Sequence, residues 1–155
     1  QYGPVVALGM PGETRVPFGA MRYYSKHEDW QRIVTETAQR AQAIVIGAGS
    51  TPGVLWEYGL LAREKLVDRS LLLFPPTGSG GDASAAALRA FAQATGTATG
   101  RTLPDDDGRL IALLMTDAGP TLLRAREPDA AAYLVAVRAH FQRTTATQLA
   151  DPLRV

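Results

Sequence analysis

The chain has 155 residues, a formal net charge of +1 and a hydrophobic fraction of 46%. A single chain of this length can bury about two-thirds of its unfolded surface in one core. The near-neutral charge predicts no nucleic-acid partner and no contact of this segment itself with a membrane surface. The absence of cysteine excludes disulfides, thiolate metal ligands and a cysteine nucleophile.

The first predicted elements are a buried strand at residues 5–9, a long loop at 10–18 and a short edge strand in "GAMRYYS". Ser25 and Glu28 predict a capping box at the start of a helix. The apolar face of that helix comprises Trp30, Ile33, Val34, Thr37, Ala38 and Ala41.

Strands and helices alternate along the rest of the chain. We expect strands at 43–47, 70–74 and 109–115, and helices at 51–66, 82–96 and from Pro128 onward. The apolar stripe of the last helix comprises Tyr133, Leu134, Val137 and Phe141, before the polar "QRTTATQ". Continuous apolar strands predict one α/β domain over residues 1–155, a three-layer open parallel sheet with helices on both faces. A ligand would then bind at the carboxyl ends of the strands, where the strand of residues 5–9 neighbours that of 43–47.

The stretch "IVIGAGSTPGVLWE" follows one of these strands into a helix. Its glycines are spaced GxGxxxG, one residue longer than the dinucleotide fingerprint, and the next strand ends in Phe74-Pro75-Pro76 where an acidic residue is required. Neither this stretch nor the other glycine-rich loops form a P-loop, and we predict no cofactor. The glycines are equally consistent with a tight turn and with close approach of a ligand, whose anionic group the amides of residues 51–53 could receive.

Glu57 stands in the second turn of this helix, and none of its helical neighbours is basic. It is either a catalytic carboxylate or a solvated glutamate. The candidate ligand-binding residues are Gly9, Met10, Pro11, Gly12, Arg22, Gly49, Ser50, Thr51, Gly53 and Trp56. We predict no metal site, because the two histidines lack a third ligand at metal spacing and residues 105–107 are typical of an exposed turn.

"GSTPGVLWEYGLLAREK" resembles the Gly-Thr-x-x-Glu-x-Gly-x-Ala segment of nucleoside 2-deoxyribosyltransferases, with matches at Glu57, Gly59 and Ala62. In that family the glutamate is the nucleophile. In the related TIR domains, many of which cleave NAD, a catalytic glutamate lies on the helix after this strand, often near a tryptophan such as Trp56. The resemblance therefore implies a flavodoxin/TIR-like fold and a catalytic Glu57. The transferases carry an Asp before their Gly-Thr, where this chain has Ser50 before Thr51.

Residues 3–76 also resemble the cytoplasmic domains of uncharacterised bacterial membrane proteins, in which "GPVVALGMPGE", "GAMRYY", "EDWQRIV" and "STPGVLWE" recur in this order. This implies a cytoplasmic piece of a longer, membrane-anchored protein. The resemblances together lead us to expect cleavage or transfer of an N-glycosidic bond in NAD, a nucleoside or a nucleotide. They also lead us to expect that copies of this chain associate into a homo-oligomer. The alternative is a non-catalytic nucleotide-sensing or protein-interaction domain.

Overall fold

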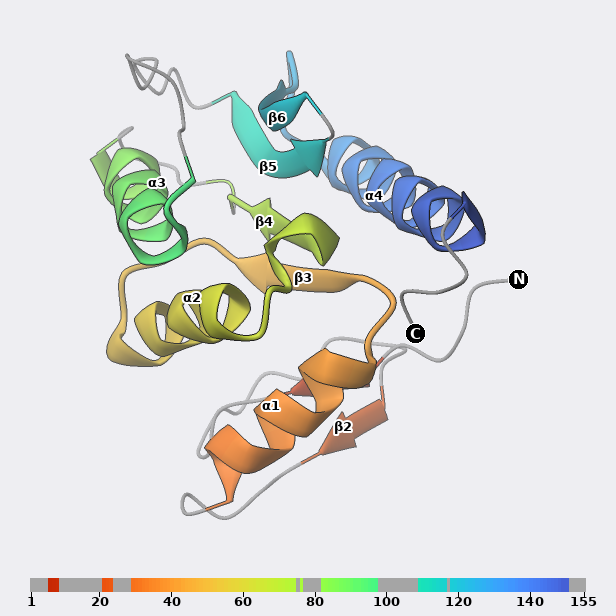
Figure 1. The fold of residues 1–155 in the computed structure, drawn as a ribbon. Helices are drawn as coiled ribbons and strands as arrows, with labels where there is room; N and C mark the ends of the chain where they lie inside the picture. Colours follow the sequence, from red (N-terminus) through yellow and green to blue (C-terminus); the bar gives the residue numbers. More distant parts are fainter. Residues whose placement is uncertain are drawn as a thin grey trace. The chain divides into compact units, whose positions relative to one another are not determined.

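The computed structural model describes residues 6–8, 21–23, 29–74, 76, 82–97, 109–116 and 118–150. The chain divides into two compact units, Gln1–Arg40 and Ala41–Val155. Helices and strands alternate along it, as the colours of Figure 1 show, so the α/β class predicted from the sequence is confirmed.

The first unit contains β1 (Val6–Leu8), β2 (Met21–Tyr23) and α1 (Trp30–Arg40). β1 and β2 pair in parallel, which confirms both short strands. The helix is confirmed as well, with Val34 and Ala38 buried on its predicted apolar face. The predicted capping box lies outside the described residues.

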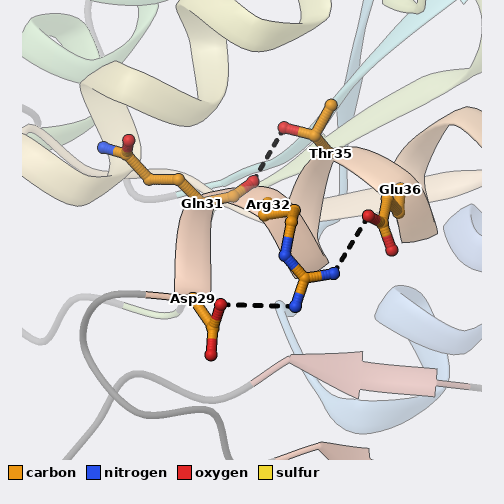
Figure 2. Close-up of polar contacts among 5 residues, drawn as sticks. All are labelled: Asp29, Gln31, Arg32, Thr35 and Glu36. Carbon is orange, nitrogen blue, oxygen red and sulfur yellow. Dashed lines mark hydrogen bonds and ion pairs between the residues drawn. The ribbon is translucent and has the colours of Figure 1, made fainter.

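The polar face of α1 carries a small set of contacts between neighbouring turns (Figure 2). The guanidinium of Arg32 donates to Glu36 at 3.0 Å and to Asp29 at 3.3 Å, and the hydroxyl of Thr35 donates to the carbonyl of Gln31 at 2.7 Å. These side chains are exposed, and exposed ion pairs contribute little to stability. The apolar face of α1 therefore contributes more than its ion pairs.

The second unit is built on a four-stranded sheet in the order β3 (Ile44–Gly47), β4 (Ser70–Leu73), β5 (Leu110–Thr116) and β6 (Gly119–Arg124). β3 and β4 are parallel, but β4–β5 and β5–β6 are antiparallel, so the prediction of a fully parallel sheet is wrong. The reason is that β5 lies between two strands and is buried along almost its whole length. A strand that is covered on both faces has a continuous run of apolar residues whether it is parallel or antiparallel to its neighbours.

The strand β6 was not predicted. It follows β5 through a hairpin in which Thr116 pairs with Gly119, and the Thr116 hydroxyl donates to the Gly119 carbonyl at 2.8 Å. Gly119 has φ 105°, a conformation that favours glycine. Pro120 follows it, and proline is tolerated here because β6 is an edge strand of this sheet.

The helices of the second unit are α2 (Pro52–Arg63), α3 (Asp82–Thr95) and α4 (Ala130–Ala150), with a 3-10 turn, η1 (Val67–Arg69), before β4. All three predicted helices are confirmed. In the view of Figure 1, α4 lies on one side of the sheet and α2 and α3 lie on the other. None of the helices in the described part of the chain combines the length and apolar character needed to cross a membrane.

One buried cluster of this unit lies where α4 packs on the sheet. Its buried members are Leu71, Ile111, Ala112, Leu114 and Ala136. On the opposite face of the sheet, Leu72 and Leu113 pair across β4 and β5 and are also buried. The predicted stripe of α4 needs correction at Leu134, which is 68% exposed, whereas the fully buried line of α4 runs through Ala136, His140 and Thr144.

Candidate functional site

The start of α2 is built as the sequence predicts. Thr51 is the N-cap, with φ −68° and ψ 153°, and its hydroxyl accepts from the Val54 amide at 3.5 Å. Pro52 occupies the first turn, and the amide of Leu55 donates to the carbonyl of Thr51 at 2.9 Å. The cap therefore places α2 directly after the carboxyl end of β3. The Thr51 hydroxyl also occupies the Val54 amide, which could otherwise donate a hydrogen bond to a bound anion.

The glycines at this junction are not required by backbone conformation. Among the described residues, only Lys65, Gly96 and Gly119 have positive φ. A Cβ added at Gly47 would meet nothing within 4 Å, and one at Gly49 would meet only the Val54 methyl groups, at 3.7 Å or more. The space above Gly47 is open, so a ligand could approach this backbone closely.

Glu57 lies on the buried side of α2. The residues three and four positions later, Leu60 and Leu61, are both buried, so the glutamate shares a face with them at the amino-terminal half of the helix. Its side chain is half-buried, and within the described residues it forms no hydrogen bond or ion pair. Burial raises the pKa of the Glu57 carboxyl above its ordinary value. This half-buried position differs from that of a fully solvated glutamate, and a catalytic role for Glu57 stays a prediction.

Tyr58, the next residue, is fully buried between α2 and α3. Its ring meets that of Phe91 edge to face, with centroids 5.3 Å apart. Its hydroxyl accepts from the amide of Gly49 and donates to the carbonyl of the same residue, each at 3.2 Å. Burial raises the pKa of Tyr58, and the neighbouring Glu57 charge adds to the rise.

Trp56 is half-buried and stacks within its own helix. The guanidinium carbon of Arg63 lies 5.9 Å from its ring centroid, within the range of a cation–π contact. Gly59 lies between them, and a Cβ there would come within 3.2 Å of an Arg63 nitrogen. The glycine that matches the transferase segment therefore leaves room for the end of the Arg63 side chain.

The structure brings together only part of the predicted site. Gly49, Ser50, Thr51, Gly53 and Trp56 lie around the β3–α2 junction with Glu57. The candidates Gly9, Met10, Pro11 and Gly12 lie outside the described residues, and Arg22 belongs to β2 in the first unit.

The expected strand neighbours at this site need a correction. Residues 5–9 and 43–47 were expected to pair, but β1 pairs with β2 and β3 pairs with β4. Residues 9–12 were expected beside Glu57 because of that pairing, and the observed strand pairs do not support this placement. Within the described ranges, no cluster of three or more His, Asp or Glu side chains could hold a metal ion.

Polar side chains also gather where β3 and β4 begin. His140 is fully buried, and its Nε2 lies 3.0 Å from the carbonyl oxygen of Arg69; because a carbonyl only accepts, Nε2 carries the proton. Its Nδ1 is buried without a hydrogen bond. Burial, followed by the nearby charge of Arg143, lowers the pKa of His140 to about 4. The backbone of Arg69 and Ile44 acts in the opposite direction and raises this pKa.

Further contacts join α4 to this same edge. Arg143 donates to the carbonyl of Asp68, Arg69 donates to the carbonyl of Ala41 at 3.0 Å, and Gln42 donates to the Thr145 hydroxyl at 2.7 Å. The sequence did not predict this network. The four-residue spacing of Ala136, His140 and Thr144 was the available signal, but it mixes polar and apolar residues.

Comparison of the chain with protein-family models, curated proteins and solved structures found no match. The interpretation of the site therefore depends on its own geometry. Among the described residues, that geometry is a half-buried carboxylate without a cation beside it, next to open backbone at the end of a strand. Such a carboxylate can stabilise a positive centre, act as a nucleophile or accept a proton.

Proposed function

We propose that this chain cleaves or transfers an N-glycosidic bond in NAD, a nucleoside or a nucleotide, with Glu57 as the catalytic residue. The single observation that supports this most is the half-buried carboxylate of Glu57 near the carboxyl end of β3, which has no hydrogen-bond or ion-pair partner among the described residues. A poorly hydrated carboxylate is costly for stability, and such groups concentrate at functional sites. The proposal includes kinship with the flavodoxin/TIR-like superfamily, which the "LWEYG" segment suggests.

The chemistry of the reaction explains why one carboxylate is enough. Cleavage of an N-glycosidic bond develops an oxocarbenium-like centre, which a carboxylate can stabilise or capture as a glycosyl ester. Water or an acceptor base then attacks that centre and releases the carboxylate. Nicotinamide leaves NAD as a neutral ring, whereas most nucleobases need a proton from a second acid. No second acid is paired with Glu57 in the described part of the chain, which favours NAD as the substrate.

The test is the substitution Glu57→Gln, which keeps the shape of the side chain and removes its charge. We expect the release of nicotinamide from NAD to fall by more than about a hundredfold, or about 3 kcal/mol of barrier. The matched control is Glu127→Gln, which removes the same charge from an exposed position and should leave turnover unchanged. Base release from a panel of nucleosides and nucleotides, measured alongside, identifies the substrate class.

The pH profile gives a second measurement on the same site. Catalysis requires the ionised carboxylate, and burial raises the pKa of Glu57. Turnover should therefore decline, as the pH falls, at a higher pH than an ordinary glutamate would give. The assay should cover a range of protein concentrations, because a homo-oligomeric site would lose specific activity on dilution. Equal turnover by wild type and Glu57→Gln would remove Glu57 from the mechanism.

A non-catalytic sensing or interaction domain is the second candidate, and one observation favours it. Leu134 and Val135 on α4 are 68% and 67% exposed, although both are large apolar residues. Adjacent exposed apolar side chains are typical of surfaces that bind a partner. Binding of NAD or a nucleotide without turnover of any N-glycoside, in a calorimetric titration, would favour this function over catalysis.

A further inference from the structure

The hydroxyl of Tyr58 joins the loop of residues 48–51 to α2. It accepts a hydrogen bond from the Gly49 amide and donates one to the Gly49 carbonyl, so both polar groups of one loop residue depend on a single side chain. A phenol can do this because its oxygen is both a donor and an acceptor. The ring itself is held edge-on by Phe91 of α3, at an interplanar angle of 86°. The hydroxyl therefore reaches the loop from a fixed position.

The same loop residue lies against the helical turn that precedes Glu57. The Cβ position of Gly49 is 3.7 Å from a methyl group of Val54, and Val54 stands three residues before Glu57 on α2. A loop held at Gly49 thus contacts the first turn of the helix that carries the carboxylate. If the hydroxyl were absent, nothing on the Tyr58 ring could replace either hydrogen bond, and water could enter between the loop and α2.

We propose that Tyr58 is a positioning residue of the Glu57 site: its hydroxyl holds residues 48–51 against α2 and limits the water that reaches the Glu57 carboxylate. Its catalytic consequence rests on the proposed function, but the contact can be measured on the protein alone. A carboxylate in a water-poor site stabilises a developing cation better than one in bulk water. Tyr58 would act on the reaction only through Glu57.

The experiment is Tyr58→Phe, which keeps the ring and its contact with Phe91. Nuclear magnetic resonance should show two changes in the free protein. The Gly49 amide should exchange with solvent roughly five- to tenfold faster, the effect of losing one hydrogen bond. The pKa of the Glu57 carboxyl should fall toward its ordinary value, since burial is what raises it. A purely structural role for Tyr58 would leave that pKa unchanged.

Two further variants separate the hydroxyl from general packing. Tyr133→Phe deletes a hydroxyl that donates to the Phe74 carbonyl at 2.6 Å, and it should alter neither the Gly49 exchange rate nor the Glu57 pKa. Phe91→Leu loosens the Tyr58 ring but keeps its hydroxyl, so it should lower stability while Gly49 loses less protection than in Tyr58→Phe. If Tyr58→Phe fails to fold, the amide exchange of Gly49 is measured in the wild-type protein alone. Exchange at the rate of a free peptide would then overturn the proposal.

The outcomes distinguish this inference from the proposed function. In wild type and variants assayed with NAD, kcat should fall in Tyr58→Phe while KM changes little. If Glu57→Gln keeps full turnover but Tyr58→Phe shifts both resonance measurements, the loop contact stands and the catalytic function fails. If Tyr58→Phe leaves the Gly49 exchange rate and the Glu57 pKa as they are in wild type, Tyr58 is not a positioning residue, whatever the assay shows.

Discussion

At the edge of the sheet where β3 and β4 begin, side chains bind the backbone of neighbouring elements. His140 contacts the Arg69 carbonyl, and Arg143 donates to the carbonyl of Asp68. At the edge where the same strands end, Glu57 has no hydrogen-bonding partner among the described residues, although burial raises its pKa. Both edges place ionisable groups in poorly hydrated surroundings. At the first edge His140 and Arg143 connect elements, whereas at the second Tyr58 connects a loop to α2 and Glu57 bonds to none of the described residues.

This difference predicts that substitutions at the first edge change mainly stability, whereas substitution of Glu57 at the second edge changes mainly the proposed activity. A buried polar group that is hydrogen-bonded repays much of its desolvation cost, whereas an unpaired carboxylate does not. The amino-terminal edge should therefore lose stability when its side chains are changed. At the carboxyl-terminal edge, substitution of Glu57 should lower the proposed activity and raise the stability of the protein.

The largest effect on stability is expected for His140→Ala. The substitution leaves the Arg69 carbonyl without its partner and opens a cavity in a fully buried position. We expect the free energy of unfolding to fall by about 3 kcal/mol. Chemical denaturation measures this, with Leu134→Ala as the control, since that exposed position on the same helix should cost less than about 0.5 kcal/mol. Equal costs would mean that the edge network does not stabilise the fold.

Acid should weaken the same edge by a similar or slightly smaller amount. The pKa of His140 is lowered from 6.5 to about 4 in the folded chain, so the unfolded chain binds more protons between these values. Stability from this group is present above pH 6.5, declines as the pH falls, and is lost below about pH 4. The total is on the order of 3 kcal/mol. Denaturation curves between pH 7 and about pH 4 should show this slope in wild type and a shallower one in His140→Ala.

At the other edge, Thr51→Ala should cost about 1 kcal/mol or less, since it removes only the N-cap of α2. Thr51→Ser keeps a capping hydroxyl and should cost less than the alanine variant. If Thr51 also contacts the ligand, Thr51→Ala will raise KM at equal protein stability while Thr51→Ser will not. Thermal melting together with NAD kinetics separates the two roles, and a stability loss above that of a cap would require another contact.

The smallest effect, and the one of opposite sign, is expected for Glu57→Gln. Because the pKa of Glu57 is raised in the folded chain, ionisation at neutral pH destabilises the fold, and stability from this group increases as the pH falls through that raised pKa. The neutral amide should therefore make the protein more stable than wild type at pH 7, and the gain should shrink toward pH 4.5. A loss of stability at pH 7 would place Glu57 among structural residues.

Local patterns predicted most elements of the fold. Thr51 and Pro52 marked the start of α2 because capping depends on a few adjacent residues. Strand direction was not predictable in the same way, because β5 is buried on both faces and its sequence is apolar in either direction. β6 was missed because Pro120 and the exposed positions of an edge strand weaken the strand pattern.

The candidate site was predictable at Glu57 but not at its supports. The lack of a basic neighbour on α2 already set Glu57 apart in the sequence, and its raised pKa agrees with a recessed position. The contact from Tyr58 to Gly49 depends on how the loop folds back over the helix, which no sequence pattern encodes. His140 and its partner Arg69 are distant in sequence, so only the structure identifies the pair.

The helix α4 bonds to residues at both ends of the parallel strand pair, and it follows those strands in the sequence. Tyr133 bonds a residue 59 positions earlier, His140 one 71 positions earlier and Thr145 one 103 positions earlier. A ribosome adds about 5 to 20 residues per second. The α4 residues that make these contacts are therefore synthesised up to roughly 5 to 20 seconds after β3 and β4. During that interval the apolar face that α4 covers is exposed, so a chaperone that binds nascent apolar strands should improve the yield of this protein.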